Sequence, residues 1–320
     1  MSKYKKLDLS RAKTIKSSRR KVKADISNFG KALDPEKTVS EFLNSLPAFL
    51  KAADLMELSE KIARAKIEGK TIIWMMGAHP VKVGLSPVFI DLLEKGFVSH
   101  LAVSGAFMIH DIEIAFFGRT SEDVAEGIGD GSFGMVEETP QMLFEAAGLS
   151  KNEGLGLGEG VGRYIETRSP EFKDYSILMN CHTRDIPVSV HLAVGTDTIS
   201  QHPGFDGGLF GKMSADDFLI MAHSVSGLAG GVVINFGSAV VLPEVFLKAL
   251  TAARNIKGKI ENFAAANFDM IQHYRPNVNV VGRPVSGSGR GYSITGHHEI
   301  MMPLLAAAIK HKYKEMSERS

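Results

Sequence analysis

Short apolar runs alternate with helical stretches along most of the chain, and this alternation restricts the folds open to it. The β-prone runs lie at residues 71–76, 98–103, 188–194, 231–236 and 292–295, and helical spacing of apolar residues occurs at 85–95, 108–117, 242–255 and 300–312. Continuous apolar strands separated by helices are typical of a parallel sheet buried on both faces. We therefore predict an α/β fold with a doubly wound, mostly parallel, Rossmann-like sheet.

A basic segment precedes this pattern. The first 23 residues contain ten Lys or Arg residues and one acid, Asp8. We expect an arm at residues 1–37 and a single α/β domain at 38–320, whose first helices lie at 39–58 and 60–69. A solvated arm, or one packed on a neighbouring subunit, is favoured over an arm that contacts a membrane or RNA.

Charge and composition exclude several classes of protein. The formal net charge of 320 residues is +1, so no overall field attracts nucleic acid or an anionic membrane. The apolar runs are too short to cross a bilayer, and the basic arm lacks the apolar segment of a secretory signal. The single cysteine, Cys181, excludes an intramolecular disulfide and a cysteine-based zinc cluster. We therefore expect a cytoplasmic protein with no nucleic-acid or membrane partner.

Glycines are frequent between residues 120 and 172, where the alternating pattern weakens. The run GLGLGEGVG fits no placement of the dinucleotide fingerprint G-x-G-x-x-G, and no predicted strand leads directly into it. GLFGKMS fails as a phosphate-binding loop because Met213 follows Lys212, and no G-x-S-x-G elbow is present. We predict long loops here around one or two helices, serving as the cover of an active site.

Small residues stand directly after several predicted strands, where parallel sheets bind ligands. Backbone N–H groups in such turns can approach an anion, and the helix that follows favours its charge. The glycines are also consistent with ordinary βα turns, and Asp111 with a helix cap. Because several turns share the feature, we predict a phosphate-bearing cofactor at their common edge. The candidate residues are Gly77, Ser86, Ser104, Gly105, Ala106, Asp111, Gly237, Ser238, Gly296 and His297.

Five segments together carry a family resemblance. They are GAHPVKVGLSPVFIDLLEKG, VSHLAVSGAFMIHDIEIAFFG, IPVSVHLAVGTDTIS, GGVVINFGSAVVLPEVFLKAL and GYSITGHHEIMMPLLAAAI. They resemble the deoxyhypusine synthase family over most of residues 70–312. The resemblance implies a Rossmann-like fold that binds NAD, in a homotetramer with cofactor sites near subunit interfaces. The residues it implies for the dinucleotide are Ser104, Gly105, Ala106 and Asp111, lined by Gly237 and Gly296, and those for a substrate amine are Glu113 and Asp197.

The chain departs from that family at the residues that carry its chemistry. The family forms an imine on a lysine of a Trp-Gly-Lys motif before its last strand, whereas no lysine occurs here at residues 260–309. Its paired histidines are replaced by Pro243 and Glu244, and we assign Glu244 to the substrate. Lys82 remains as an alternative amine, or as a ligand of a phosphate or carboxylate. The chain is therefore not expected to be a deoxyhypusine synthase itself.

The favoured hypothesis is an NAD-dependent enzyme that oxidises a small amine or polyamine-like substrate, with transfer as an option. His110 or His298 would act as the general base, because an imidazole titrates near neutral pH, while Glu113 and Asp197 would orient a cationic substrate. One alternative is a catalytically inactive NAD-binding module. Another is a metal-dependent hydrolase or lyase, although no metal ligand is assigned in the favoured hypothesis. Its metal would be held by His79, His110, Asp111, His297, His298 and Glu299.

Overall fold

Six strands form one parallel sheet in the order β3-β2-β1-β4-β5-β6, in a computed structural model that describes residues 2–318. The predicted fold class is confirmed. The strands are β1 (Ile72–Met76), β2 (His100–Ser104), β3 (Val188–His191), β4 (Val232–Phe236), β5 (Ala264–Asp269) and β6 (Arg290–Thr295). Met76 pairs with both Val103 and Phe236, so the three central strands end level with one another.

The described part of the chain also contains thirteen α-helices. They are α1 (Val39–Ser45), α2 (Leu50–Ile67), α3 (His79–Lys82), α4 (Ser86–Glu94), α5 (Gly105–Phe117), α6 (Val124–Asp130), α7 (Glu138–Glu153), α8 (Leu157–Arg168), α9 (Ile177–His182), α10 (Gly207–Ser226), α11 (Val241–Lys257), α12 (Tyr274–Asn279) and α13 (His298–Ser317). No helix in residues 2–318 is long and apolar enough to pass through a membrane.

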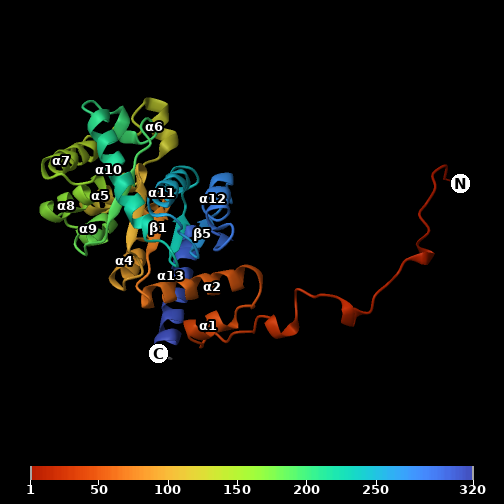
Figure 1. Cartoon of the computed structure of the whole chain (residues 1–320). Coiled ribbons are helices and arrows are strands. Elements are labelled where there is room, and N and C mark those ends of the chain that lie inside the picture. The colour runs from red at the N-terminus through yellow and green to blue at the C-terminus, as the bar shows by residue number, and fades with distance from the viewer. Residues whose placement is uncertain (1, 319–320) are drawn as a thin grey trace. The chain divides into compact units, whose positions relative to one another are not determined.

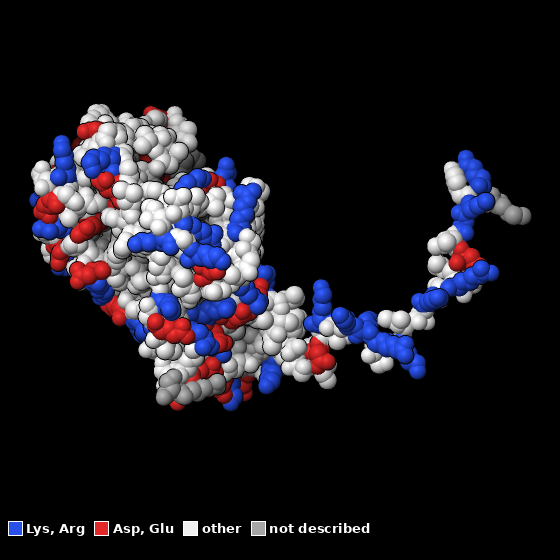
Figure 2. Space-filling model, viewed as in Figure 1, with Lys and Arg blue, Asp and Glu red and all other residues white. Residues whose placement is uncertain are grey.

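The chain divides into two units, Met1–Ala53 and Asp54–Ser320. In the first unit, three short 3-10 turns precede α1, which begins with a capping box between Thr38 and Glu41. Lys and Arg side chains are frequent along this arm, as Figure 2 shows. The predicted helix at 39–58 is interrupted after α1, at Pro47, and the second helix, α2, runs on without a break to Ile67.

The second unit contains the sheet, which is buried on both faces because its side chains alternate between two cores. Trp74 and Met76 pack into the core shared with α4, α5, α8, α9 and α13. Ile73 and Met75 face the opposite core, which contains Val225 of α10 together with the apolar face of α11. Figure 1 shows this layered arrangement of helices about the strands.

The glycine-rich stretch forms helices, contrary to the prediction of loops around one or two helices. Residues 124–168 contain α6, α7 and α8, and the GLGLGEGVG run lies mainly in α8. A Cβ atom on Gly158 would lie 2.6 Å from the carbonyl oxygen of Val188, and one on Gly162 would lie 2.7 Å from that of Leu178. The glycines therefore allow α8 to pack closely against β3 and α9. Sequence pattern missed this because glycine lowers helix propensity.

β3 is an edge strand of the sheet, and side chains of α10 cover its open side. Asp217 is fully buried, and its Oδ2 accepts hydrogen bonds from the amides of Val190 on β3 (2.7 Å) and Gly158 on α8 (3.0 Å). Ser214 accepts another from the amide of Leu192 (3.1 Å). These bonds satisfy backbone donors that an edge strand would otherwise leave unpaired. Burial raises the pKa of Asp217 to about 7, although hydrogen bonds from the backbone amides of Val190, Gly158 and Leu157 oppose that shift.

The close packing of α8 can be tested with Gly162→Ala. We expect the free energy of unfolding to fall by roughly 1–3 kcal/mol, because the added methyl group overpacks the contact with the Leu178 carbonyl. Urea denaturation followed by circular dichroism measures the change. Gly148→Ala in α7 is the matched control, since its Cβ would meet nothing within 4 Å, and it should be neutral or stabilising. Equal effects of the two substitutions would contradict this packing.

The raised pKa of Asp217 predicts a pH effect on stability. An unfolded aspartate releases its proton near its model value of 3.8, whereas folded Asp217 retains its proton up to about pH 7. The unfolding free energy of the wild type should therefore fall, relative to that of Asp217→Asn, as the pH rises through this window. Urea denaturation at several pH values measures the difference. Asp174→Asn, a substitution at an exposed position, should run parallel to the wild type, and a parallel Asp217→Asn curve would refute the assignment.

Candidate functional site

The strand order places a topological switch point between β1 and β4, where the chain leaves the sheet in opposite directions. The turns at the carboxyl ends of the strands are linked to neighbouring strands by hydrogen bonds from backbone amides. Gly77 donates to the Phe236 carbonyl (3.1 Å), Gly237 to that of Phe268 (3.0 Å), and Gly296 to that of Asp269 (3.1 Å). The predicted turns therefore converge on one edge of the sheet.

Gly77 and Gly237 make the closest backbone approach at the switch point. A Cβ atom on Gly77 would lie 2.2 Å from the carbonyl oxygen of Gly237, so no larger residue fits there. Gly237 also has a φ of 72°, in the left-handed region that favours glycine. The two turns thus depend on glycine for their mutual contact, in which Gly77 is buried and Gly237 is half-buried.

Two histidines meet beside this contact. The Nδ1 atoms of His79, the first residue of α3, and His298, the first residue of α13, lie 2.8 Å apart. His298 is 1% exposed, and its ring centroid lies 5.1 Å from that of Phe236, with the two rings tilted at 48°. Its Nε2 has no hydrogen-bond partner among the described residues and lies 3.9 Å from Oδ1 of Asp269. One buried imidazole nitrogen is therefore free at the carboxyl edge.

The protonation of His298 is set by its surroundings. Burial lowers the pKa of His298, the charge of His79 lowers it further, and Asp269 acts in the opposite direction. The net shift is downward, so the imidazole is neutral at pH 7. A neutral imidazole with a free nitrogen can accept a proton or a hydrogen bond. The sequence analysis proposed this role, that of a general base, for His298.

The start of α5 carries the next group of predicted residues. Ser104 caps the helix by accepting from the amide of Phe107, and the Asp197 carboxylate accepts from the amides of Ala193 and Ala106. A Cβ atom on Gly105 would lie 2.2 Å from Oδ2 of Asp197. Burial raises the pKa of Asp197, while the two amides limit the shift. The N-terminus of α5 therefore already faces a carboxylate of the protein.

Asp111 lies deep in the protein, away from these turns. Its carboxylate accepts hydrogen bonds from the Ser176 hydroxyl (2.6 Å) and from the amides of Ile177 (2.7 Å) and Leu178 (3.2 Å). It is fully buried, and burial raises its pKa to about 6 despite these bonds. Asp111 thus caps a helix, as one sequence interpretation suggested, but the helix is α9 and not its own helix α5.

His110 and Glu113 belong to a network on the outer turns of α5. Nδ1 of His110 lies 2.6 Å from the hydroxyl oxygen of Thr120, which donates to Glu113, and Thr139 donates to the second Glu113 oxygen (3.0 Å). Burial raises the pKa of Glu113, but hydrogen bonds from His110, Thr120 and Thr139 outweigh it and leave the pKa lowered. The carboxylate is therefore charged and occupied by its own neighbours.

The other predicted residues are distributed around the edge. Ser238 is buried and accepts from the amide of Leu242, whereas His297 is an exposed N-cap of α13, 3.8 Å from Glu299. Glu244 forms ion pairs with Lys248 and Arg275, and a hydrogen bond with Asn279; of these, Lys248 contributes most to lowering its pKa. Lys82 and Ser86 line a separate pocket. Among residues 2–318, no group of three or more His, Cys, Asp or Glu side chains is arranged to hold a metal.

The sequence analysis missed two features of this site. Asp269 was not considered because β5 begins with Ala264, Ala265 and Ala266, which lack the bulky β-prone side chains of the other strands. His79 was named only as a metal ligand, and its contact with His298 joins residues 219 positions apart. The His-His-Glu run and the Asn-Phe-Asp sequence were the available signals, but neither specifies a distant partner.

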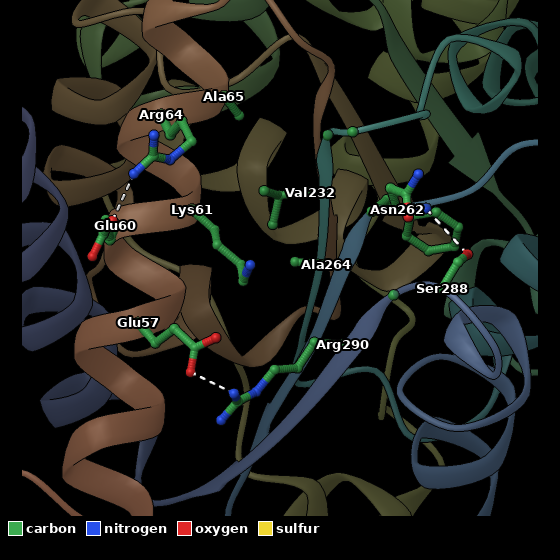
Figure 3. Close-up of a pocket in the computed structure, with 14 residues that line it drawn as sticks. Glu57, Glu60, Lys61, Arg64, Ala65, Val232, Asn262, Ala264, Ser288 and Arg290 are labelled. Carbon is green, nitrogen blue, oxygen red and sulfur yellow. Dashed lines mark hydrogen bonds and ion pairs between the residues drawn. The ribbon is translucent and has the colours of Figure 1, made fainter.

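A hollow also lies at the opposite end of the sheet, beside the amino ends of the strands. A pocket of about 470 Å³ is bounded by α2 and by the first residues of β4, β5 and β6 (Figure 3). Its charges are mixed, because Arg64 pairs with Glu60 and Arg290 pairs with Glu57. Ligands of parallel α/β sheets gather at the carboxyl ends of the strands, so this amino-edge hollow is not the candidate site.

Comparison with known proteins supports the fold. No family model and no curated protein matches the chain. A conserved LOR/SDH protein from Methanococcus maripaludis matches with a TM-score of 0.53 and 15% identity, over 91% of this chain and 74% of that chain. AgrE, solved in a ternary complex with ornithine and NAD+, matches with a TM-score of 0.53 and 13% identity, over 84% of this chain and 34% of that chain.

A third neighbour is ArgZ, a cyanobacterial arginine dihydrolase of the ornithine-ammonia cycle. It matches with a TM-score of 0.50 and 13% identity, over 83% of this chain and 33% of that chain. The present chain thus spans about a third of the length of ArgZ and AgrE. The Rossmann-like fold implied by the deoxyhypusine synthase resemblance is confirmed, whereas membership of that family is not shown at these identities.

The contact between Gly237 and His298 predicts the effect of Gly237→Ala. Its Cβ would lie 2.5 Å from Cε1 of His298, so both backbone strain and displacement of the imidazole are expected. We expect a loss of about 2–4 kcal/mol in the free energy of unfolding and a changed NMR signal of the His298 ring. Gly230→Ala is the matched control, with the same φ of 72° and only the Lys70 side chain nearby. If Gly237→Ala costs no more than its control, the contact does not determine the site.

Proposed function

We propose that the chain is an NAD-dependent enzyme that oxidises a small amine, with the dinucleotide bound along the carboxyl edge of the sheet. The observation that carries this proposal is the switch point between β1 and β4, where the backbones of Gly77 and Gly237 pack together beside a buried histidine. Dinucleotides bind at such a crevice in doubly wound sheets. AgrE, a neighbour of the same fold, was solved with ornithine and NAD+, which supports both the cofactor and an amine substrate.

We propose a position for the pyrophosphate of the dinucleotide along this edge. Asp197 already accepts from the Ala106 amide of α5, so the pyrophosphate would lie nearer the switch point, at Gly77, Gly237 and Ser238 and the start of α11. Ser104, Gly105 and Ala106 would flank it on one side. Gly296 and His297 would flank it on the other side. Asp111 has no part in the proposed site because its carboxylate caps α9.

The free Nε2 of His298 is the second sign of a ligand. A buried polar nitrogen without a partner is costly, and such atoms usually have a partner in the functional state. The nitrogen lies at the edge where both cofactor and substrate would meet. We propose that it hydrogen-bonds to the substrate amine.

The chemistry follows from these positions. NAD, when bound, supplies the acceptor for a hydride from the carbon that bears the amine. Neutral His298 accepts a proton from the substrate ammonium, so that the nitrogen lone pair can form the C=N bond as the hydride departs. Asp269, 3.9 Å from Nε2, stabilises the imidazolium that results, and His79 fixes the ring through Nδ1. Asp197 would hold the cationic substrate before it loses its proton.

Transfer of an aminoalkyl group to a lysine of this protein does not form part of the proposal. Residues 260–309, which include β5, β6 and the start of α13, contain no lysine. Lys82, the alternative amine of the sequence analysis, lines another pocket. Oxidation with release of the imine is therefore the proposed reaction.

We also propose that the chain works as a homo-oligomer. Large apolar side chains are exposed on the loops and helix starts that follow β4, β5 and β6, namely Val240, Ile271, Tyr274 and Ile300. Exposed apolar residues gathered at one edge mark an interaction surface. Their position next to the carboxyl edge would bring the cofactor site close to a second copy.

The proposal is tested by titrating the purified chain with NAD+ in a calorimeter and then following nicotinamide reduction with a series of small amines and amino acids. His298→Asn should still bind NAD+ but should reduce it about 10²–10⁴-fold more slowly, because the proton acceptor is lost. His223→Asn, an exposed substitution on α10, is the control and should retain the wild-type rate. Absence of NAD+ binding, or an unchanged rate in His298→Asn, would overturn the proposal.

A further inference from the structure

A pocket of about 490 Å³ beside α3, α4 and the end of α5 has a charge pattern unlike any other hollow described above. Its charged lining residues are both cationic, Lys82 at the end of α3 and Arg119 directly after α5. Neither side chain forms a hydrogen bond or ion pair with another residue in the range 2–318. No acidic side chain lines the pocket, so its electrostatic potential favours an anion.

The start of α4 opens onto the same pocket. Leu85 occupies the N-cap position and provides no side-chain cap, so the amides of Ser86 and Val88 at the start of this nine-residue helix are not satisfied by its own cap; Pro87 between them has no N–H group. Ser86, the first helical residue, lines the pocket and is 2% exposed. Its hydroxyl oxygen is buried without a hydrogen-bond partner among the described residues. An uncapped helix N-terminus and an unpartnered buried hydroxyl thus coincide at one place.

The remaining lining is largely apolar. Ile114, Phe172 and Tyr175 form much of it, and Phe172 packs against Gly118, where a Cβ would lie 2.9 Å from the ring. The volume lies within the range of small-molecule sites, which combine an apolar lining with a few polar groups that fix orientation. A bare inorganic ion would leave most of this lining without contact.

We infer that this pocket binds a small molecule that joins an anionic group, a carboxylate or a phosphate, to an apolar body. The anionic group contacts Lys82, Arg119, the Ser86 hydroxyl and the start of α4, and the apolar body packs against Phe172 and Tyr175. This binding site goes beyond the proposed function, because it does not require NAD. It lies close to the proposed reaction site, since Lys82 and His79 are three residues apart on α3.

Calorimetric titration of the full chain with phenyl phosphate, benzoate, inorganic phosphate and benzyl alcohol tests the inference. At least one aromatic anion should bind roughly tenfold or more tightly than neutral benzyl alcohol, because charge-assisted hydrogen bonds are lost in the alcohol. Stronger binding of phenyl phosphate identifies a phosphate ester as the ligand class, and stronger binding of benzoate identifies a carboxylate. Equal affinity for benzyl alcohol, or no binding of any aromatic anion, overturns the inference.

Variants locate the bound anion. Lys82→Met and Arg119→Met should each weaken binding of the better aromatic anion by roughly tenfold, and Ser86→Ala by a smaller factor. Ser86→Ala removes no hydrogen bond within the protein, so the fold should be retained and circular dichroism checks it. Lys151→Met on α7 removes the same charge at an exposed position away from the pocket and should leave affinity unchanged. Wild-type affinity in all three pocket variants would overturn the assignment.

Titration with NAD+ in the same variants separates this inference from the proposed function. Aromatic anions that bind the wild type while NAD+ does not would support the pocket and refute the proposed cofactor. Binding of NAD+ without any aromatic anion would refute the pocket alone. A parallel loss of NAD+ and phenyl phosphate affinity in Lys82→Met would show that the pocket belongs to the dinucleotide site, and would overturn the inference of a separate ligand.

Discussion

The structure of the candidate site depends on the approach of two backbones, those of Gly77 and Gly237. The turns after β1 and β4 come so close that a Cβ atom on Gly77 would reach within 2.2 Å of the Gly237 carbonyl. This contact holds the ends of the two central strands together at the switch point. It also brings the start of α3 beside the start of α13, so that His79 meets His298. A larger residue at either glycine would separate the elements that form the site.

The same reliance on small residues governs the distant edge of the sheet. Glycines in α8 bring this helix against β3, and Asp217 of α10 then reaches the amides of both elements. The carboxylate is shielded from water, and its raised pKa reflects the cost of that burial. Closure of the edge strand therefore depends on a polar group that is held by two hydrogen bonds. Such an arrangement protects β3 from pairing with another chain.

The sequence predicted the fold class because apolar strand runs are local and strong signals. It failed at β5, whose three alanines resemble a helix as much as a strand, and in α8, whose glycines resemble a loop. The convergence of the small-residue turns was also predictable, since the carboxyl ends of parallel strands share an edge. The pairing of His79 with His298 was not, because it depends on how far two glycine turns approach each other. The hydrogen bonds to the carboxylates of Asp111 and Glu113 could not be predicted either, because they come from donors on other helices.

The two proposed sites impose complementary demands on one ligand. At the carboxyl edge, Asp197 and neutral His298 suit a substrate amine that arrives as a cation and then loses a proton. Beside α4, Lys82 and Arg119 suit an anionic group. The short helix α3 joins the two, since His79 and Lys82 are separated by less than one turn. A substrate that bridged both sites would carry an amine and an anion on an apolar frame. Recognition of opposite charges at two fixed positions would then select a zwitterion against a simple polyamine, because a polyamine would place a cation beside Lys82 and Arg119.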